Sequence, residues 1–476
     1  MSTLLCCGLG AFTSCNNTFD NPTPETAAVE RYVFEEQFSE DLQAMADEFR
    51  FESAIQASTS IKEFINVLDE RALAEKTLDV ISQIIQGLEG VNMADLSEEE
   101  RAVVALSLKE RFDMTDEEIQ NTTTFNIVDA YKSLAKLKVE FKDGQCTVTD
   151  DAEGFTIVST NAAGETRTLV LNFNDERDGV RFFAARIANV VPIAIQLPKS
   201  IGVTLTTPNG QVATGTINLT TAEANQPKFI NFKLSGWQAD ATLVANVNNR
   251  QESAYFYAKH TEQRAFDMKV AFKIQDKEMA RLEINDMHNP YTEEELNSEE
   301  FQSMREMGPF FSGAYDVLKA INGKSVDKIV ITLNDNMVIE GKVDDVAKSL
   351  IALGNVRKLY GTKPGKEAID RYTQELNSLV HFTVSQKNTE ITANATLLTA
   401  MKNQQEGEYQ PVVALRFDGE TEAQAMFDRM KQTDMDNYKK IINNIRPLAM
   451  EVSETLIVAR KKLEAIGGAI KDYFTN

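Results

Sequence analysis

Thiols and imidazoles are the rarest reactive groups in this chain of 476 residues, which has four cysteines and three histidines. Cys6, Cys7 and Cys15 lie close together near the start, and Cys15 follows the apolar run Leu4–Phe12 and two small residues. An apolar run that ends in small residues has the form of a secretory signal. The thiol of Cys15 is therefore the side chain that we single out for covalent chemistry.

The segment Leu4–Cys15, with Phe-Thr-Ser-Cys at 12–15, resembles the lipobox of bacterial exported lipoproteins of the Bacteroidota type. The resemblance covers about the first 25 residues. It implies lipidation of Cys15, removal of the preceding residues, and a lipid-anchored protein of the cell envelope at the outer membrane. Two or three acyl chains, at about 0.8 kcal/mol per buried CH₂, hold a protein firmly at a membrane. Because no Lys or Arg precedes the apolar run, we expect the true start to lie further upstream.

The histidines His260, His288 and His381 are far apart in the sequence. Neither His-Glu-x-x-His nor Gly-x-Ser-x-Gly occurs. We therefore predict no catalytic residue, no metal site and no cofactor, and lean against an enzyme. Cys146 follows an Asp-Gly turn and is predicted to be a core thiol.

The formal net charge is −23. Residues 25–120 hold 24 acidic and 8 basic residues, which indicates a solvated acidic helical surface. Nucleic acid and anionic membrane surfaces would repel such a chain, so we exclude both as main partners.

Alternating aromatic residues suggest a binding surface in the stretch Lys228–Asn285. Tyr255 and Tyr257 flank Phe256, so they point to the opposite face of the strand from it. Together with Trp237 they form the candidate surface for a protein or glycan partner. The alternative is that helices cover both faces and bury the tyrosines.

The apolar face of the same stretch is rich in alanine, at 239, 241, 245, 254 and 258. Alanine is a poor strand former, so its repeated use points to a packing requirement. A closely packed helix would explain it, and so would an apolar trough for a lipid-like ligand. We favour the closely packed helix, because protein interiors leave few voids.

Periodicity predicts the elements that position these residues. Helical spacing dominates from residue 25 to about 138, with a predicted apolar stripe (Val29, Val33, Phe38, Leu42, Met45, Phe49) and capping boxes that begin at Ser60, Ser97 and Thr115. From residue 137 the period changes to two, and hairpins lead into four consecutive antiparallel strands within Lys228–Asn285. After an acidic connector to residue 300, hairpins and helices alternate, with a helix predicted after Thr421 and a long helix at 434–474.

The predicted fold class is α+β, with a helical N-terminal region, a long antiparallel β-meander sheet and a mixed α/β C-terminal region ending in a long helix. The predicted segments are a signal and lipobox at 1–15, a tether at 16–24, an acidic helical region at 25–136, the meander at 137–286 and the α+β region at 300–476. The predicted function is a lipid-anchored envelope protein with a non-enzymatic binding or structural role. A carrier of an apolar ligand between sheet and helices, or a hydrolase without a recognisable motif, stay open as alternatives.

Overall fold

The computed structural model describes residues 25–69, 71–72, 74–75, 78, 90–92, 98, 101, 105, 115–120, 123–126, 136–143, 145–150, 154–174, 181–184, 193–196, 198–208, 210–221, 228–230, 233–235, 237–247, 250–261, 266–359, 364–403, 407–426 and 430–475. The chain divides into two compact units. Unit 1 contains the described residues within 25–51 and 263–449, and unit 2 those within 52–262 and 450–475. Each unit therefore combines distant segments of the sequence. The predicted segments do not follow this division.

The strands of unit 1 form an antiparallel meander in the order β22-β21-β20-β19-β18-β17-β16-β15. Their bounds are β15 (Phe266–Ile274), β16 (Lys277–His288), β17 (Ser325–Leu333), β18 (Met337–Val343), β19 (Val380–Gln386), β20 (Thr392–Asn403), β21 (Glu408–Phe417) and β22 (Gln424–Ala425). The β17–β18 turn contains Asn334 and Asp335 at positive φ, which Asn and Asp tolerate better than most residues.

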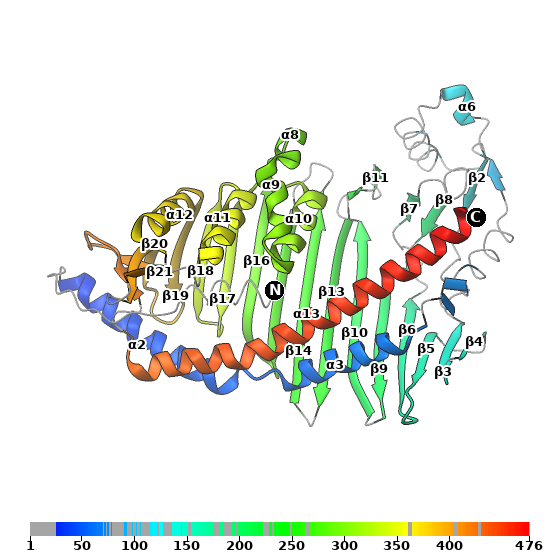
Figure 1. Ribbon diagram of the computed structural model, residues 1–476, viewed down its shortest axis with the longest axis horizontal. Coiled ribbons are helices and arrows are strands. Elements are labelled where there is room, and N and C mark those ends of the chain that lie inside the picture. The colour runs from blue at the N-terminus through cyan, green and yellow to red at the C-terminus, as the bar shows by residue number, and fades with distance from the viewer. Residues whose placement is uncertain are drawn as a thin grey trace. The chain divides into compact units, whose positions relative to one another are not determined.

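Helices cover unit 1 in two groups (Figure 1). The connections between strands supply α8 (Glu293–Asn297), α9 (Glu299–Ser303), α10 (Pro309–Ile321), α11 (Val346–Leu359) and α12 (Lys366–Leu379), with a 3₁₀ turn at Met304–Glu306. The second group is α2 (Glu25–Glu48) with the first part of α13 (Gln432–Thr475). Helix α2 reaches the turn ends of the strands, where Asp41 accepts hydrogen bonds from Asn334 and Asn336.

These two groups of helices give unit 1 a dense core. Neighbouring residues with opposite side-chain directions are both buried, such as Met279 with Ala280 and Ala414 with Leu415. The largest fully buried side chains of the unit include Phe34, Phe49, Phe311, Phe417, Met45, Met304, Ile369 and Ile441. Strands of unit 1 are therefore covered on both faces at these positions.

The main sheet of unit 2 has the order β14-β13-β10-β9-β6-β5-β3-β4, antiparallel except for the parallel pair β3–β5. The bounds are β3 (Lys138–Lys142), β4 (Gln145–Thr149), β5 (Phe155–Thr160), β6 (Thr166–Asn174), β9 (Ser200–Thr207), β10 (Gly210–Thr221), β13 (Trp237–Val247) and β14 (Arg250–His260). Shorter strands form a second sheet from β1 (Gly90–Asn92), β2 (Thr123–Asn126), β7 (Arg181–Ala184) and β8 (Ile193–Gln196), and a pair from β11 (Lys228–Ile230) and β12 (Lys233–Ser235).

Helix α3 (Glu52–Val67) packs on the main sheet of unit 2, and the second part of α13 runs beside α3. Ser58 Oγ lies 2.9 Å from Thr455 Oγ1, and Lys62 Nζ lies 2.7 Å from Glu451 and 2.9 Å from Glu454. Phe64 belongs to a buried cluster with Phe141 and Ile157, against which Cys146 packs. A short helix, α6 (Asp116–Gln120), is also described in this unit.

The α+β fold class is confirmed, as are the antiparallel strands and the long terminal helix, which continues through Pro447. The capping box of Thr115 with Glu118 is also confirmed, because Glu118 N donates to Thr115 Oγ1 and Thr115 N donates to the Glu118 carboxylate. The box predicted at Ser60 is wrong, since Ser60 lies inside α3. Ser97 lies outside the described residues.

Four further expectations need correction. Val29 and Val33 are exposed, and Phe34 takes their place in the buried stripe of α2. No helix begins at Thr421, because the next residues form the short strand β22. The predicted connector 285–300 holds the end of β16 and the start of α8 and α9. The first of the four strands predicted within Lys228–Asn285 is a separate small hairpin, and β10 pairs with β13 instead.

Candidate functional site

Three adjacent strands of unit 2 place large apolar side chains on one face. The register pairs Ile217 of β10 with Ala241 of β13, and Ala241 with Phe256 of β14. In the next row of the same face, Leu243 stands between Gly215 and Ala254. We call Ile217, Ala241, Leu243, Ala254 and Phe256 the apolar strip.

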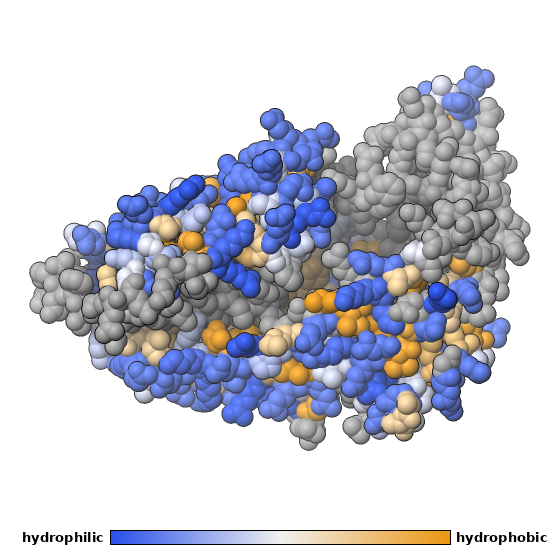
Figure 2. All heavy atoms as spheres, viewed as in Figure 1, coloured by the Kyte–Doolittle hydropathy of each residue, from blue (hydrophilic) through white to orange (hydrophobic). Residues whose placement is uncertain are grey.

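The apolar strip is open although it belongs to the face on which α3 packs. Leu243 is 52% exposed, Phe256 41% and Ile217 40%. Single exposed apolar side chains are common, but a contiguous group on one face is typical of a binding surface. Figure 2 shows hydrophobic residues gathered over β6, β9 and β10 beside α3 and α13 in unit 2.

Buried residues bound the strip at both ends of β14. Side chains at alternate positions share a face, and on this face Glu252, Ala258 and His260 are buried while Phe256 is exposed. The strip is therefore a gap in the cover of the face, with closed regions before and after it along the strand.

A carboxylate fixes α3 over one of these closed regions. Glu252, which is 4% exposed, accepts hydrogen bonds from Ser53 N at 3.3 Å and Ala54 N at 2.8 Å. These amides belong to the first turn of α3, where backbone N–H groups lack partners within the helix. Arg250 Nε donates to the same carboxylate at 2.9 Å. Glu252 thus pairs with free N–H groups at the start of α3 and fixes where this helix begins to cover the sheet.

Small residues allow α3 to approach the sheet closely at that end. Ala57 and Ala245 form a buried cluster, with Ala213 and Val247 packed against it. The preference for a closely packed helix is therefore met at Ala245, but the same helix leaves Leu243 exposed. Glycine matters here as well, because a Cβ at Gly215 would lie 2.6 Å from Leu243 Cδ2.

The structure does not bring together the three residues of the predicted binding surface. Tyr255 pairs with Thr242 and Tyr257 with Asp240, so both tyrosines lie on the face opposite the apolar strip and are half-buried. Trp237 lies on the same face as the strip and stacks on His260, with ring centroids 6.4 Å apart. Cys15 lies outside the described residues.

Sequence reasoning did not identify Ile217, Leu243 and Phe256 as a group. The available signal was the placement of two large apolar residues, Leu243 and Phe256, among the alanines of β13 and β14. The register that adds Ile217 pairs segments separated by the small hairpin β11–β12, so local patterns could not supply it.

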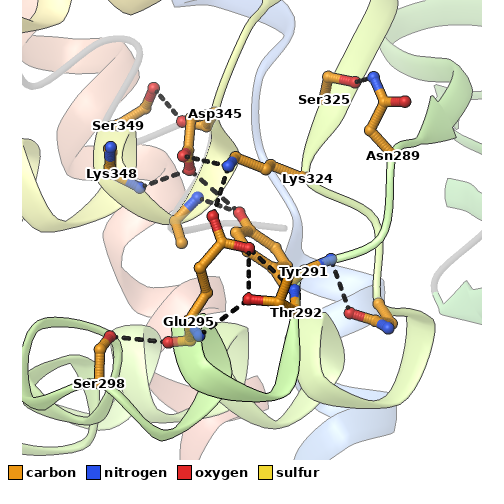
Figure 3. A network of polar contacts seen from close by, with 12 residues as sticks. Asn289, Tyr291, Thr292, Glu295, Ser298, Lys324, Ser325, Asp345, Lys348 and Ser349 are labelled. Atoms are coloured by element: carbon orange, nitrogen blue, oxygen red, sulfur yellow. Dashed lines mark hydrogen bonds and ion pairs between the residues drawn. The ribbon is translucent and has the colours of Figure 1, made fainter.

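A polar network in unit 1 contains clustered acidic residues, which the hydrolase alternative would need (Figure 3). Tyr291 Oη donates to Asp345 at 3.1 Å and accepts from Ala347 N at 2.9 Å. Lys324 Nζ lies 2.6 Å from Glu295 and 3.8 Å from Asp345. Burial, followed by the nearby Asp345 carboxylate, raises the pKa of Tyr291.

The network serves local structure. Glu295 and Thr292 form a capping box at the start of α8, and Asp345 caps α11 by accepting from Lys348 N at 3.0 Å. The hydrogen bond from Lys324, and then the bond from Thr292 N, lower the pKa of Glu295 to about 2. A carboxylate with that pKa stays ionised and is a poor proton donor near neutral pH. The network joins two helix starts to β17, and it does not favour the hydrolase alternative.

A cavity of about 70 Å³ beside α2 is also structural in character. Arg31 lines it and is held by Glu420, with Nε 2.7 Å from Oε1 and Nη2 2.5 Å from Oε2. The guanidinium also lies 4.6 Å from the centre of the Phe417 ring. The Glu420 carboxylate already forms a bidentate pair with Arg31. This pair holds α2 against the end of β21.

Comparison with family models, curated proteins and solved structures finds no match for this chain. Among the described helices, none is both long enough and apolar enough to cross a membrane.

Proposed function

We propose that this protein is a binding protein of the cell envelope, anchored by a lipid on Cys15, which takes up an apolar ligand on the apolar strip of unit 2. The observation that carries the ligand proposal is the exposure of Ile217, Leu243 and Phe256 between buried residues of one face. The anchor rests on the resemblance of residues 4–15 to a lipobox.

The different side-chain sizes within the apolar strip favour a chain-like ligand such as a fatty acyl chain. Strands lie about 4.8 Å apart, so Phe256 and Ile217 stand roughly 10 Å from each other across Ala241. The methyl group of Ala241 is much smaller than its two neighbours, so it forms the floor of a shallow groove between them. A hydrocarbon chain in this groove would remove three apolar side chains from water, and each buried CH₂ of the ligand contributes about 0.8 kcal/mol.

Charge argues against two other occupants of the strip. With a net charge of −23, the protein is repelled by an anionic membrane surface and by a second copy of itself. A single small ligand meets much less repulsion. We therefore commit to an acyl chain, and membranes and dimers become outcomes that the test can return.

The ligand proposal is tested with a fluorescent long-chain fatty acid and two variants, Leu243→Asp and Phe256→Asp. A charge in the groove opposes burial of hydrocarbon, so we expect each variant to weaken binding at least about tenfold, which corresponds to about 1.4 kcal/mol. Binding is measured by fluorescence titration of the unacylated Cys15→Ala chain, so that the protein's own lipid cannot compete.

Thr242→Asp is the matched control, because it adds the same charge to the same strand on the opposite face. It should bind the fatty acid as the parent chain does. Absence of saturable binding, or equal affinities in all four proteins, contradicts the ligand proposal. Binding to vesicles or self-association that is lost in Leu243→Asp would assign the strip to a membrane or to a dimer.

The anchor is tested separately by metabolic labelling with a radioactive fatty acid in a bacterial host that processes lipoproteins. We expect the parent chain to incorporate label and to fractionate with membranes, and Cys15→Ala to do neither. Label that persists in Cys15→Ala contradicts the anchor, whatever the outcome for the apolar strip.

A further inference from the structure

Two aspartates face each other across neighbouring strands of unit 1. Asn285 of β16 pairs with Lys328 of β17, and Met287 pairs with Val326, so Asp286 stands opposite Asp327. Both side chains are more than half exposed. Like charges directly opposite each other destabilise a sheet unless something neutralises them.

His288 lies between the two carboxylates. Its Nδ1 is 3.7 Å from Asp286 Oδ1, and its Nε2 is 3.8 Å from Asp327 Oδ1. Nδ1 also lies 2.8 Å from the backbone oxygen of Asp286. A carbonyl oxygen can only accept, so Nδ1 carries the proton of this hydrogen bond. In the neutral ring, Nε2 then presents a lone pair toward the Asp327 carboxylate.

The lysines nearest along the two strands already have acidic partners. Lys324 Nζ pairs with Glu295, and Lys328 Nζ lies 2.9 Å from Glu340. Among the described residues, neither Asp286 nor Asp327 forms an ion pair with a lysine or arginine. A further carboxylate, that of Asp267, accepts a hydrogen bond from Asp286 N at 2.8 Å and adds to the negative charge. The Nε2 lone pair and the two carboxylates thus lie near one another, and none of them is paired with a described lysine or arginine.

We propose that His288, Asp286 and Asp327 bind a divalent transition-metal ion, with Zn²⁺ as the best match. One donor atom from each residue lies within 4.8 Å of the other two. Imidazole and carboxylate are both ordinary zinc ligands, at about 2.0–2.2 Å from the metal. Two ligands of a tetrahedral ion stand roughly 3.4 Å apart at those bond lengths. Rotation of the exposed Asp286 and Asp327 side chains can close the remaining distance.

The backbone around His288 is held as a metal ligand requires. Lys324 N donates to His288 O at 2.8 Å. The side chain of the next residue, Asn289, donates from Nδ2 to Ser325 Oγ at 2.8 Å (Figure 3). The hydrogen bond from Nδ1 to a carbonyl fixes the ring so that Nε2 is the ligand, which is the usual arrangement of zinc-bound histidine. Three protein ligands leave a position for water, so the ion would be accessible from solvent.

The site is tested by isothermal titration of the full-length chain with Zn²⁺ after chelation and alkylation of all cysteines, since free thiolates would compete. We expect saturable 1:1 binding that weakens at least about tenfold in His288→Ala and in Asp327→Asn. Thermal melting should show that both variants unfold cooperatively, as the parent chain does. Nitrogen-15 NMR of the imidazoles should show the Nε2 resonance of His288 shifting as Zn²⁺ is added.

His381→Ala is the matched control. His381 Nε2 also faces a carboxylate, at 3.4 Å from Asp344 Oδ2, but among the described residues it forms no cluster with a second carboxylate. The control should bind Zn²⁺ as the parent chain does. Absence of saturable binding, or an affinity unchanged in His288→Ala and Asp327→Asn, overturns the proposal. So does a spectrum in which His288 is protonated at both nitrogens and does not respond to Zn²⁺.

Discussion

Units 1 and 2 share a scheme and differ in how far their strands are covered. In both, a helix from the N-terminal third packs near the turn ends of antiparallel strands, and part of α13 runs beside it. Unit 1 adds α10 from the connection between β16 and β17. It adds α11 and α12 from the connection between β18 and β19. Only two residues separate β9 from β10, and only two separate β13 from β14 in unit 2. A connection of two residues leaves no room for a covering helix, whereas the connections after β16 and β18 supply α10, α11 and α12.

The two units also differ in how they cover their large side chains. The strands of unit 1 bury Phe417 and Met279, together with alanines such as Ala280 and Ala414. Unit 2 uses alanine where α3 approaches, at Ala245, and places Leu243 and Phe256 beyond the reach of that helix. A buried phenylalanine gains stability from its burial, whereas an exposed one contributes little to folding and more to the binding of a ligand.

The sharpest test of the comparison is a pair of identical substitutions. Phe417 is 1% exposed and packs edge-on against Phe34, with ring centroids 5.3 Å apart. We expect Phe417→Ala to lower the free energy of unfolding by about 3–5 kcal/mol. Phe256→Ala, in the open strip, should lower it by about 1 kcal/mol or less. Urea denaturation followed by circular dichroism measures both.

The single tryptophan assigns each transition to a unit, because Trp237 belongs to unit 2. Loss of stability in Phe417→Ala should appear in the circular dichroism of the whole chain before the fluorescence of Trp237 changes. Equal losses of unfolding free energy in Phe417→Ala and Phe256→Ala would contradict the distinction between a sealed and an open face.

A smaller effect concerns the polar network that joins the extra helices of unit 1. The pKa of Glu295 falls from 4.5 to about 2 in the folded chain, chiefly through Lys324. A depressed carboxyl pKa contributes stability above pH 4.5 that is lost as the pH falls toward 2. Because Glu295 is partly exposed to solvent, we expect less than about 1 kcal/mol.

The measurement compares melting temperatures of the parent chain and Glu295→Gln from neutral pH down to about pH 2. The parent chain should melt higher at neutral pH, and the gap should close on acidification. Glu294→Gln removes a charge one residue away on the same helix and serves as the control for the loss of charge alone. A gap that is independent of pH would assign the effect to the shape of the side chain, not to its charge.

Local chemistry made much of the fold predictable. The hairpins at 138–149 and 325–343 followed from turn residues that tolerate positive φ, since Asp143 and Asn334 both adopt it. The capping box at Thr115 followed from its spacing. The same spacing at Thr292 and Glu295 was overlooked, although that pair forms a complete box.

What could not be predicted depends on contacts between distant residues. Alternation placed Tyr255 and Tyr257 on a different face from Phe256, but it did not reveal how far α3 extends over that face. His288 ends β16, whereas His260 ends β14 and His381 lies in β19. The placement of Asp286 and Asp327 beside His288 became visible only through the β16–β17 register. Sequence spacing cannot relate Asp286 to Asp327, because two helices and a 3₁₀ turn, followed by α10, lie between their strands.

The position of α13 at the end of the sequence affects when each unit can fold during synthesis. Its first part lies against Asp47 and Ser39 of unit 1, and its second part against Ser58 and Lys62 of unit 2. These contacts join residues almost 400 positions apart, such as Ser58 and Thr455, with a separation of 397. A ribosome must therefore finish nearly the whole chain before either unit can close. For a protein that we propose to be exported, such a late closure would keep the nascent chain open for passage through a membrane.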